Sequence, residues 1–213
     1  MTPTTGSPNL VFHPCTSARW SDLERLFGER GACGGCWCMF WRLPRKEFDA
    51  GKGTGNKRAL KKIVTANREP GLIAYTGDEP IAWCAVAPRH EYVALERSRI
   101  LKPIDDEEVW SISCLFIKKA FRRSGVSAQL LRAAVEFAAQ RGARIVEGYP
   151  VEPSMENMSD PFLWNGTASA FRAAGSAEAL RRSRSRPIMR FKVKSAGEGR
   201  STAVHRKIAS KAG

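Results

Sequence analysis

Arg122-Arg123-Ser124-Gly125-Val126-Ser127 is the stretch of sequence that decides the fold, because a predicted strand precedes it and a predicted helix follows it. Residues 109–117 are predicted to form a buried strand, and residues 128–141 an amphipathic helix. A glycine-containing loop that opens a helix brings unpaired backbone N–H groups and the positive end of the helix dipole to one place. Such a place favours the binding of a phosphate group.

The two flanking elements are predicted from the spacing of their apolar residues. Every second residue of the strand belongs to one apolar series, which predicts one strongly apolar face. This series is Trp110, Ile112, Cys114 and Phe116. The helix carries an apolar stripe at helical spacing, made of Leu130, Leu131, Ala134, Val135, Phe137 and Ala138. Gly142 is expected to end the helix, and a second strand at residues 144–149 completes a crossover unit.

This loop carries a resemblance to a known family. The order Arg122-x-x-Gly125-x-Ser127 resembles the coenzyme A pyrophosphate loop of the GNAT N-acetyltransferases, usually written Gln/Arg-x-x-Gly-x-Gly/Ala. Ser127 departs from that pattern, but serine is small enough to leave room for a backbone approach. The resemblance implies an α/β fold, namely a GNAT-like single domain with a mixed, mostly antiparallel central sheet flanked by helices on both faces.

The resemblance extends over most of the chain. Residues 11–30 are similar to the family's first strand and helix, with Thr16 or Ser17 as a predicted N-cap. The central hairpin, the last helix and the final strand of the family would correspond to residues 71–87, 164–175 and 186–193. We therefore expect a flexible N-terminal tail at residues 1–9, the acetyltransferase-like domain at residues 10–194 and a basic flexible tail at residues 195–213.

Length and composition favour a single soluble domain. A chain of 213 residues is long enough to bury a substantial core. No apolar run approaches 18 residues, and no basic, apolar and small-residue leader is recognisable. We therefore expect no membrane association and a cytoplasmic location.

The positive charge is concentrated near the C-terminus. Residues 181–213 contain eleven Lys or Arg and one acid, so they contribute +10 of the formal net charge of +14. A basic tail of this kind could contact nucleic acid through its phosphates. The alternative is that the tail only keeps the protein soluble or is simply an unstructured end.

The cysteines have a spacing that suggests two further chemistries. Cys33-Gly-Gly-Cys36-Trp-Cys38 resembles a metal knuckle or a redox dithiol in its spacing. Zinc needs about four ligands, and the three histidines are scattered along the chain, so we expect no metal. Cys84 and Cys114 are expected to be small, reduced core residues.

A second glycine-containing stretch competes for a phosphate. Residues 51–57 contain three glycines and two lysines, but they fit neither the Walker nor the dinucleotide-binding pattern, and no strand precedes them. They are predicted to form a loop that ends at Thr54 as an N-cap. The helix that follows is expected to expose its basic residues Lys57, Arg58, Lys61 and Lys62 to solvent.

The resemblance implies acetyl-CoA as co-substrate, with no metal. By analogy, the strand residues Leu115, Phe116 and Ile117 would hydrogen-bond the pantetheine arm and present a backbone N–H to the oxyanion. The loop would bind the pyrophosphate, through Arg122, Arg123, Ser124, Gly125, Val126, Ser127 and Ala128.

The resemblance also suggests where the acceptor lies. In this family the connection between the first two helices lies over the acceptor side of the cleft. The corresponding residues here include Trp37, Phe40 and Trp41, which would form an aromatic wall. The alternative is that Trp37 and Trp41, four residues apart, are a helical core pair.

The catalytic acid and base are harder to assign. Glu108, Glu147 and Tyr149 could act through water on the attacking amine, although the acidic run at residues 105–108 could equally be a solvated loop. The family's tyrosine, four residues before the helix-ending glycine, is replaced by Phe171, and Asn165 lies one place closer to that glycine than usual. The thiolate would then leave with another donor or with solvent, or the protein has lost activity.

The leading hypothesis is therefore an N-acetyltransferase that moves the acetyl group of acetyl-CoA to a primary amine by direct attack in a ternary complex. A nucleic-acid-binding protein that uses its basic C-terminal segment is one alternative, and a CoA-binding sensor without turnover is another. A homodimer is compatible with the sequence.

Overall fold

A seven-stranded sheet forms the centre of the molecule. In the computed structural model, which describes residues 9–152 and 164–193, the strand order is β1-β2-β3-β4-β5-β7-β6. The strands are β1 (Val11–Pro14), β2 (Gly71–Thr76), β3 (Glu79–Pro88), β4 (Trp110–Ile117), β5 (Ile145–Gly148), β6 (Ala177–Arg181) and β7 (Pro187–Lys192). β4 and β5 are parallel, whereas the other neighbouring strands are antiparallel. The predicted mixed, mostly antiparallel sheet is confirmed.

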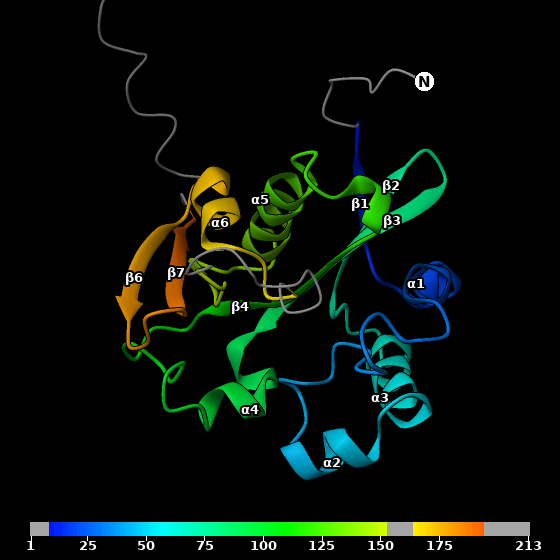
Figure 1. The fold of residues 1–213 in the computed structure, drawn as a ribbon, viewed down its shortest axis with the longest axis horizontal. Coiled ribbons are helices and arrows are strands. Elements are labelled where there is room, and N and C mark those ends of the chain that lie inside the picture. Colours follow the sequence, from blue (N-terminus) through cyan, green and yellow to red (C-terminus); the bar gives the residue numbers. More distant parts are fainter. Residues whose placement is uncertain (1–8, 153–163, 194–213) are drawn as a thin grey trace, which may run out of the picture.

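Helices cover both faces of this sheet, as Figure 1 shows. One face carries α5 (Val126–Ala139) and α6 (Ala168–Ala174). The other carries α1 (Trp20–Phe27), α2 (Arg45–Ala50), α3 (Thr54–Thr65) and α4 (Val93–Glu96). Three short 3-10 turns, η1 (Ser17–Arg19), η2 (Arg89–Glu91) and η3 (Lys119–Phe121), adjoin α1, α4 and the loop before α5.

The α5 face of the sheet holds the larger apolar cluster. The helical stripe predicted for α5 is buried there, with Leu130, Leu131 and Ala134 fully inaccessible. They pack against Leu72, Cys84 and other residues of β2, β3 and β4. Val135 is the one stripe residue that lies at the margin of this cluster. Burial of each large side chain here contributes about 1.5–3 kcal/mol, so this stripe fixes α5 to the sheet.

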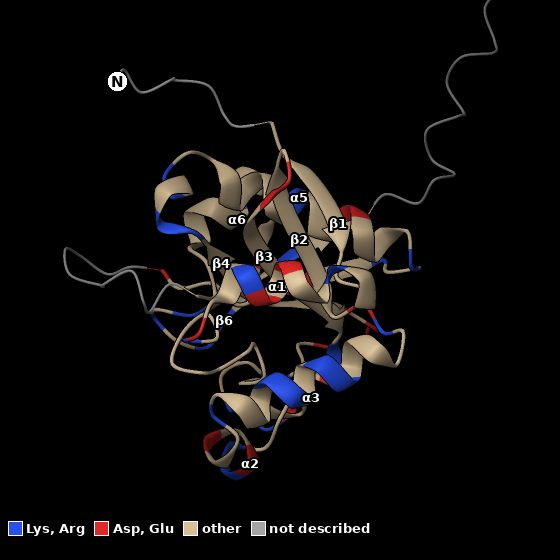
Figure 2. Ribbon diagram, turned by 90° about the vertical axis from the view of Figure 1, so that its right-hand side faces the viewer, with Lys and Arg blue, Asp and Glu red and all other residues tan. Residues whose placement is uncertain are grey.

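A second cluster lies on the opposite face. The predicted stripe of α1 is buried against it, through Trp20, Leu23, Leu26 and Phe27. Trp83 of β3 is fully buried at its centre, where Phe27 meets it edge-on with ring centroids 5.9 Å apart. The basic residues of α3 are visible along that helix in Figure 2, and Arg58, Lys61 and Lys62 are exposed as predicted. Lys57 differs, because it is half-buried and pairs with Glu24 of α1 at 2.8 Å.

The prediction of one apolar face for the strand at 110–117 is wrong. Ile112 of β4 lies opposite Val86 of β3, whereas Cys114 lies opposite Ala85, so Ser113 is an extra residue in β4. An extra residue of this kind is a β-bulge, which reverses the alternation of side chains. Trp110 and Ile112 therefore pack on the α5 face, whereas Cys114 and Phe116 join the α1 face.

Several predicted boundaries differ from the structure in detail. α5 begins at Val126 instead of residue 128, and α6 begins at Ala168 instead of residue 164. Thr54 is the first residue of α3 and not its cap, which is Gly53, and Thr16 caps η1 without a side-chain hydrogen bond. The sequence pattern does not indicate the strand β6.

The predicted tails lie outside the described residues, apart from residue 9. No helix within residues 9–152 and 164–193 is long and apolar enough to cross a membrane.

All six cysteines are free thiols.

Phe171 of α6 requires a glycine on the sheet beneath it. A Cβ atom at Gly148, the last residue of β5, would lie 2.0 Å from Cε1 of Phe171. We expect Gly148→Ala to lower the free energy of unfolding by about 1–3 kcal/mol, because a packed core does not absorb an extra methyl group. Urea unfolding of the whole chain measures this change.

Gly55→Ala is the matched control for that substitution. A Cβ atom at Gly55, in α3, would meet nothing within 4 Å. We expect this variant to be as stable as the parent or up to about 1 kcal/mol more stable, because alanine favours a helix over glycine. Equal stability of the two variants would contradict the packing argument.

Candidate functional site

The loop between β4 and α5 presents backbone N–H groups to solvent. Gly125 caps α5 in the left-handed conformation, with φ of 79°, and is exposed. Among the described residues, no backbone carbonyl accepts from the N–H groups of Val126, Ser127 and Ala128 at the start of the helix. Unpaired donors and the positive end of the helix dipole together favour an anion.

Two side chains hold this loop in place. The Ser124 hydroxyl donates to the carbonyl of Phe121 at 2.8 Å, and Nε of Arg122 donates to the carbonyl of Ile117 at 3.0 Å. Arg123 has a φ of 63°, a backbone conformation that non-glycine residues rarely adopt. Both arginines are exposed, so the loop adds positive charge around the N–H groups.

Before this loop, β4 and β5 diverge. The two strands pair only from Trp110 with Val146 to Ile112 with Gly148, and β4 then continues alone on this side to Ile117. The bulge at Ser113 lies at the point of divergence. The part of β4 that faces the gap contains Leu115, Phe116 and Ile117, for which the family resemblance implies pantetheine binding.

A short segment of the same chain crosses this gap. Residues 164–166, which we call the strap, attach to the free edge of β4. The N–H of Leu115 donates to the carbonyl of Trp164 at 2.6 Å, and Nδ2 of Asn165 donates to the carbonyl of Ser113 at 3.0 Å. Asn165 is in turn held by Arg186, whose Nη1 donates to Oδ1 at 2.9 Å. The Leu115 N–H therefore already has a partner within the chain.

Phe171 lies below the strap and has no exposed surface. Its ring contacts Phe191 of β7, with centroids 5.9 Å apart. A Cβ atom at Gly166 of the strap would lie 2.7 Å from Leu115 and 3.2 Å from Phe171. Phe171 thus fills the interior of the gap as a core residue.

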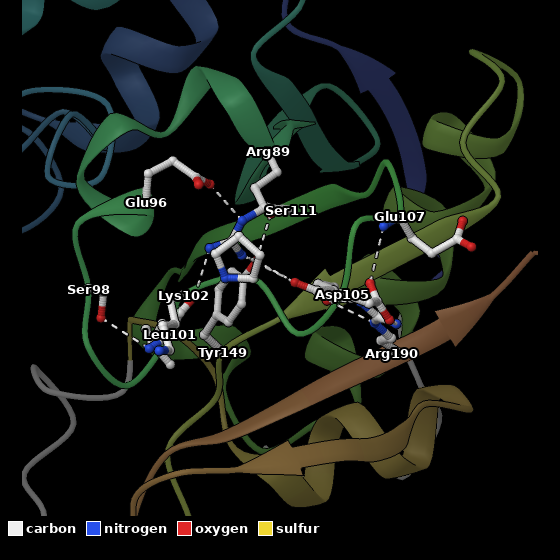
Figure 3. A network of polar contacts seen from close by, with 12 residues as sticks. Arg89, Glu96, Ser98, Leu101, Lys102, Asp105, Glu107, Ser111, Tyr149 and Arg190 are labelled. Carbon is white, nitrogen blue, oxygen red and sulfur yellow. Dashed lines mark hydrogen bonds and ion pairs between the residues drawn. The ribbon is translucent and has the colours of Figure 1, made fainter.

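Two of the three predicted catalytic residues, Glu147 and Tyr149, belong to a buried ion network. Figure 3 shows Tyr149 in this network beside Arg89 and Ser111. Glu147 of β5 is 1% exposed and accepts from two guanidinium groups, Arg89 at 3.2 Å and Arg190 at 2.8 Å. The hydroxyl of Tyr149 donates to Glu147 at 2.9 Å and lies 2.6 Å from Arg89. It also lies 2.8 Å from the hydroxyl of Ser111.

This network sets the protonation of the tyrosine. Burial, followed by the charge of Glu147, holds the pKa of Tyr149 well above its ordinary value, despite the opposing effect of Arg89. Tyr149 is therefore a neutral phenol at physiological pH. Its proton is available to a neighbour, but every group that it contacts is itself buried.

The third predicted residue is separate. Glu108 is exposed and makes no ion pair with any described residue. Within the same acidic run, Asp105 accepts from Arg190 at 2.6 and 2.8 Å, and this contact lowers the pKa of Asp105. The acidic run is thus an exposed loop that is tied to β7 at one residue.

The predicted aromatic wall divides into two parts. Trp37 is 3% exposed and stacks on Trp20 in the core, although residues 31–44 form turns and not the helix that the alternative required. Phe40 and Trp41 are half-buried beside the strap, where their rings lie 5.2 and 6.2 Å from that of Trp164. Phe40 and Trp41 therefore adjoin the gap, whereas Trp37 does not.

Two buried polar atoms next to the strap have no hydrogen-bond partner among the described residues. They are Oγ of Ser113 and Nε1 of Trp41. Leaving a buried polar group unpaired costs about 1–3 kcal/mol, which makes both atoms candidates for binding a ligand. Hollows of about 390 and 230 Å³ beside Tyr75 and Glu69 lie elsewhere on the surface.

The sequence did not indicate the strap as a functional element. Asn165 stands out in the sequence only for its spacing from the end of α6, and the contact of Trp164 is made by its backbone carbonyl, which carries no sequence signal. Ser113 could be identified as a residue of the site only from the bulge, which the sequence does not reveal.

Comparison with known proteins identifies a family. The sequence profile of the acetyltransferase (GNAT) family matches residues 37–157, which contain the strand, the loop and α5. A search of curated proteins finds no match.

Solved structures of that family share the fold. A GNAT-family acetyltransferase from Listeria monocytogenes aligns with a TM-score of 0.55 at 8% identity, over 89% of this chain and 98% of the other. Arylalkylamine N-acetyltransferase 2 from Aedes aegypti aligns with a TM-score of 0.54 at 13% identity, over 87% and 100%. At these identities the similarity concerns the fold alone.

The buried carboxylate is expected to be essential for stability. Glu147→Gln removes the charge that balances Arg89 and Arg190, and breaking a buried ion pair from one side costs about 3–5 kcal/mol. Thermal unfolding of the variant measures the loss. Glu108→Gln, at an exposed carboxylate, should change the free energy of unfolding by less than about 0.5 kcal/mol. If both variants were as stable as the parent, Glu147 would not hold the network together.

Proposed function

The chain belongs to the acetyltransferase (GNAT) family, and we propose that it transfers the acetyl group of acetyl-CoA to a primary amine by direct attack in a ternary complex. Membership of the family makes it an acetyl-CoA-dependent acetyltransferase. The class of acceptor, the residues that bind the coenzyme and the proton path are our proposals.

The loop before α5 supports the donor side of this proposal. Gly125, in its left-handed conformation, turns the chain so that the first N–H groups of α5 point outward, and Arg122 and Arg123 flank them. The pyrophosphate of CoA carries the negative charge that such a helix start favours. We assign this role to residues 122–128, which is the observation on which the proposal mainly rests.

The free edge of β4 supports the position of the pantetheine arm. Leu115, Phe116 and Ile117 run from the gap toward the pyrophosphate loop, so an extended arm could lie along them as an extra strand. The N–H of Leu115 would then face the thioester carbonyl and stabilise the oxyanion. Because that N–H is bonded to Trp164, the strap has to release it first.

The acceptor has to be a neutral amine, because a protonated nitrogen has no lone pair. For an amine with a pKa near 10.4, deprotonation at neutral pH costs roughly 4–5 kcal/mol. We assign the acceptor to the side of the gap formed by Phe40, Trp41 and Ser113. There Oγ of Ser113 and Nε1 of Trp41 have no hydrogen-bond partner among the residues that the structure describes, and the aromatic rings would cover the apolar part of the amine.

The proton that the amine loses needs a path. We retain Glu147 and Tyr149 for this role, acting through Ser111 and water, because they form one connected buried network that reaches β4. We retain Glu108 only in a lesser role. It is an exposed carboxylate, so it could accept the proton of the amine after that proton has passed into bulk water. Phe171 cannot protonate the departing thiolate, so we assign that step to solvent.

Thermal stability in the presence of acetyl-CoA tests coenzyme binding. At one hundred times the dissociation constant, binding stabilises the folded state by about 2.7 kcal/mol. For a chain of this size we expect the melting temperature to rise by roughly 5–10 °C. Gly125→Glu should abolish the rise, because it places a side chain and a negative charge at the phosphate site.

Gly142→Glu is the matched control for that variant. Gly142 follows the other end of α5, also has a left-handed φ, of 87°, and has open space around its Cβ position. It should carry the same backbone strain but keep the rise in melting temperature. A parent protein that saturating acetyl-CoA does not stabilise, or an equal rise in both variants, would overturn the donor assignment.

Turnover distinguishes the enzyme from a coenzyme sensor. Release of free CoA thiol across a panel of small amines, amino acids and peptides should exceed the rate without an amine. Coenzyme binding without amine-dependent thiol release would instead support the sensor.

A further inference from the structure

Three cysteines from distant parts of the sequence meet beside the bulge of β4. Cys36 and Cys38 come from the turns after α1, and Cys114 follows Ser113 in β4. The sulfur atoms of Cys38 and Cys114 lie 3.2 Å apart, and Sγ of Cys36 lies 3.5 Å from the backbone N of Cys38. A disulfide bond needs a separation of about 2.05 Å, so Cys38 and Cys114 are already close to bonding distance.

These thiols form a path from the surface to the core. Cys33 is exposed and Cys36 is half-buried, whereas Cys38 and Cys114 are 5% and 6% exposed. A small oxidant therefore reaches Cys36 before it reaches the inner pair. Cys36 contacts Cys38, and Cys38 contacts Cys114, so the contacts run from the most exposed of these three residues to the buried pair.

The backbone around Cys38 is held in an unusual conformation. Trp37 and Cys38 have φ of 45° and 54°, which non-glycine residues rarely adopt and which cost about 1–3 kcal/mol each. The buried Trp37 ring, stacked on Trp20 and edge-on to Phe27, holds this turn. The packing therefore keeps the Cys38 side chain directed at β4.

Metal binding does not explain this arrangement. Within residues 9–152 and 164–193, no three Cys, His, Asp or Glu side chains are placed to hold a metal ion.

We propose that Cys36, Cys38 and Cys114 form an oxidation site, at which a peroxide converts the Cys38 and Cys114 thiols into a disulfide that joins the turns after α1 to β4. In the first step Cys36 loses its proton and its thiolate attacks the O–O bond of the peroxide, which gives a sulfenic acid and, once the leaving hydroxide takes up the proton, one water. The contact with Cys38 and burial raise the pKa of Cys36, so this step becomes faster as the pH rises. The thiol of Cys38 then displaces the sulfenic hydroxyl as a second water, which leaves a Cys36–Cys38 disulfide.

The disulfide then moves inward by exchange. The sulfur of Cys114 attacks Sγ of Cys38, and Cys36 leaves as a thiol with the proton that Cys114 gives up. Overall, two thiols and one hydrogen peroxide give one disulfide and two waters. A disulfide between residues two apart is strained, which favours the exchange toward Cys114.

The site adjoins the edge of β4 that we assign to the coenzyme. Cys114 lies between Ser113 and Leu115, the two residues that the strap binds. Any effect of oxidation on acetyl transfer rests on the proposed function. The formation of the disulfide does not, so it can be tested separately.

Peptide mapping of the oxidised full-length protein tests the proposal. After hydrogen peroxide treatment, the intact mass should fall by about 2 Da for the two hydrogens lost, and the free thiols should fall by two from six. Trypsin digestion without reductant should link the peptide of residues 31–42 to that of residues 100–118. Dithiothreitol should restore the starting mass.

Variants show which sulfurs form the bond. Cys114→Ser and Cys38→Ser should abolish the link between the two peptides. Cys84→Ser should keep it, because Cys84 is equally buried, in the neighbouring strand β3, but is not placed against Cys38. If a variant fails to fold, fragmentation of the two linked peptides of the parent protein decides whether the bond is at Cys33, Cys36 or Cys38. A map without this link, or a bond between two molecules or to Cys33, would overturn the proposal.

Discussion

The parting of β4 from β5 is the constraint on which the rest of the structure depends. Two parallel strands that pair over only three residues leave an edge of unpaired backbone groups inside the molecule, and these groups have to be satisfied. The bulge at Ser113 starts the divergence, Phe171 fills the interior of the gap, and the strap supplies the missing hydrogen bonds. The pyrophosphate loop lies at the far end of the same strand, so the two halves of the proposed coenzyme site are positioned by one element.

Local patterns in the sequence were sufficient to predict this element and its surroundings. The strand, the loop and α5 follow from apolar spacing, and the hairpin of β2 and β3 from its glycine-containing turn. β6 escaped prediction because residues 177–181 form an edge strand, partly exposed along its whole length, which carries no apolar alternation. The bulge also escaped prediction. One extra residue in a strand leaves the alternation of apolar residues in the sequence unchanged, but beyond it each side chain lies on the opposite face of the sheet.

The chemistry of the site was less predictable than its position. The sequence identifies Glu147 of β5 and Tyr149, just after that strand, as titratable residues, but their partners Arg89 and Arg190 are about 60 and 40 positions away along the chain. Whether a carboxylate is buried between two arginines depends on tertiary contacts that spacing does not encode. The same holds for the thiols: the motif at residues 33–38 was visible, but Cys114 joins it only through the fold.

The strap has a consequence for how tightly any ligand can bind at the edge of β4. A ligand that uses the Leu115 N–H competes with a carbonyl of the same molecule, whose effective concentration is high because it is tethered. The apparent affinity then equals the intrinsic affinity multiplied by the fraction of molecules in which the strap is released. Asn165 and Arg186 govern that fraction without having to touch the ligand. Affinity at this site is therefore adjustable from outside the site itself.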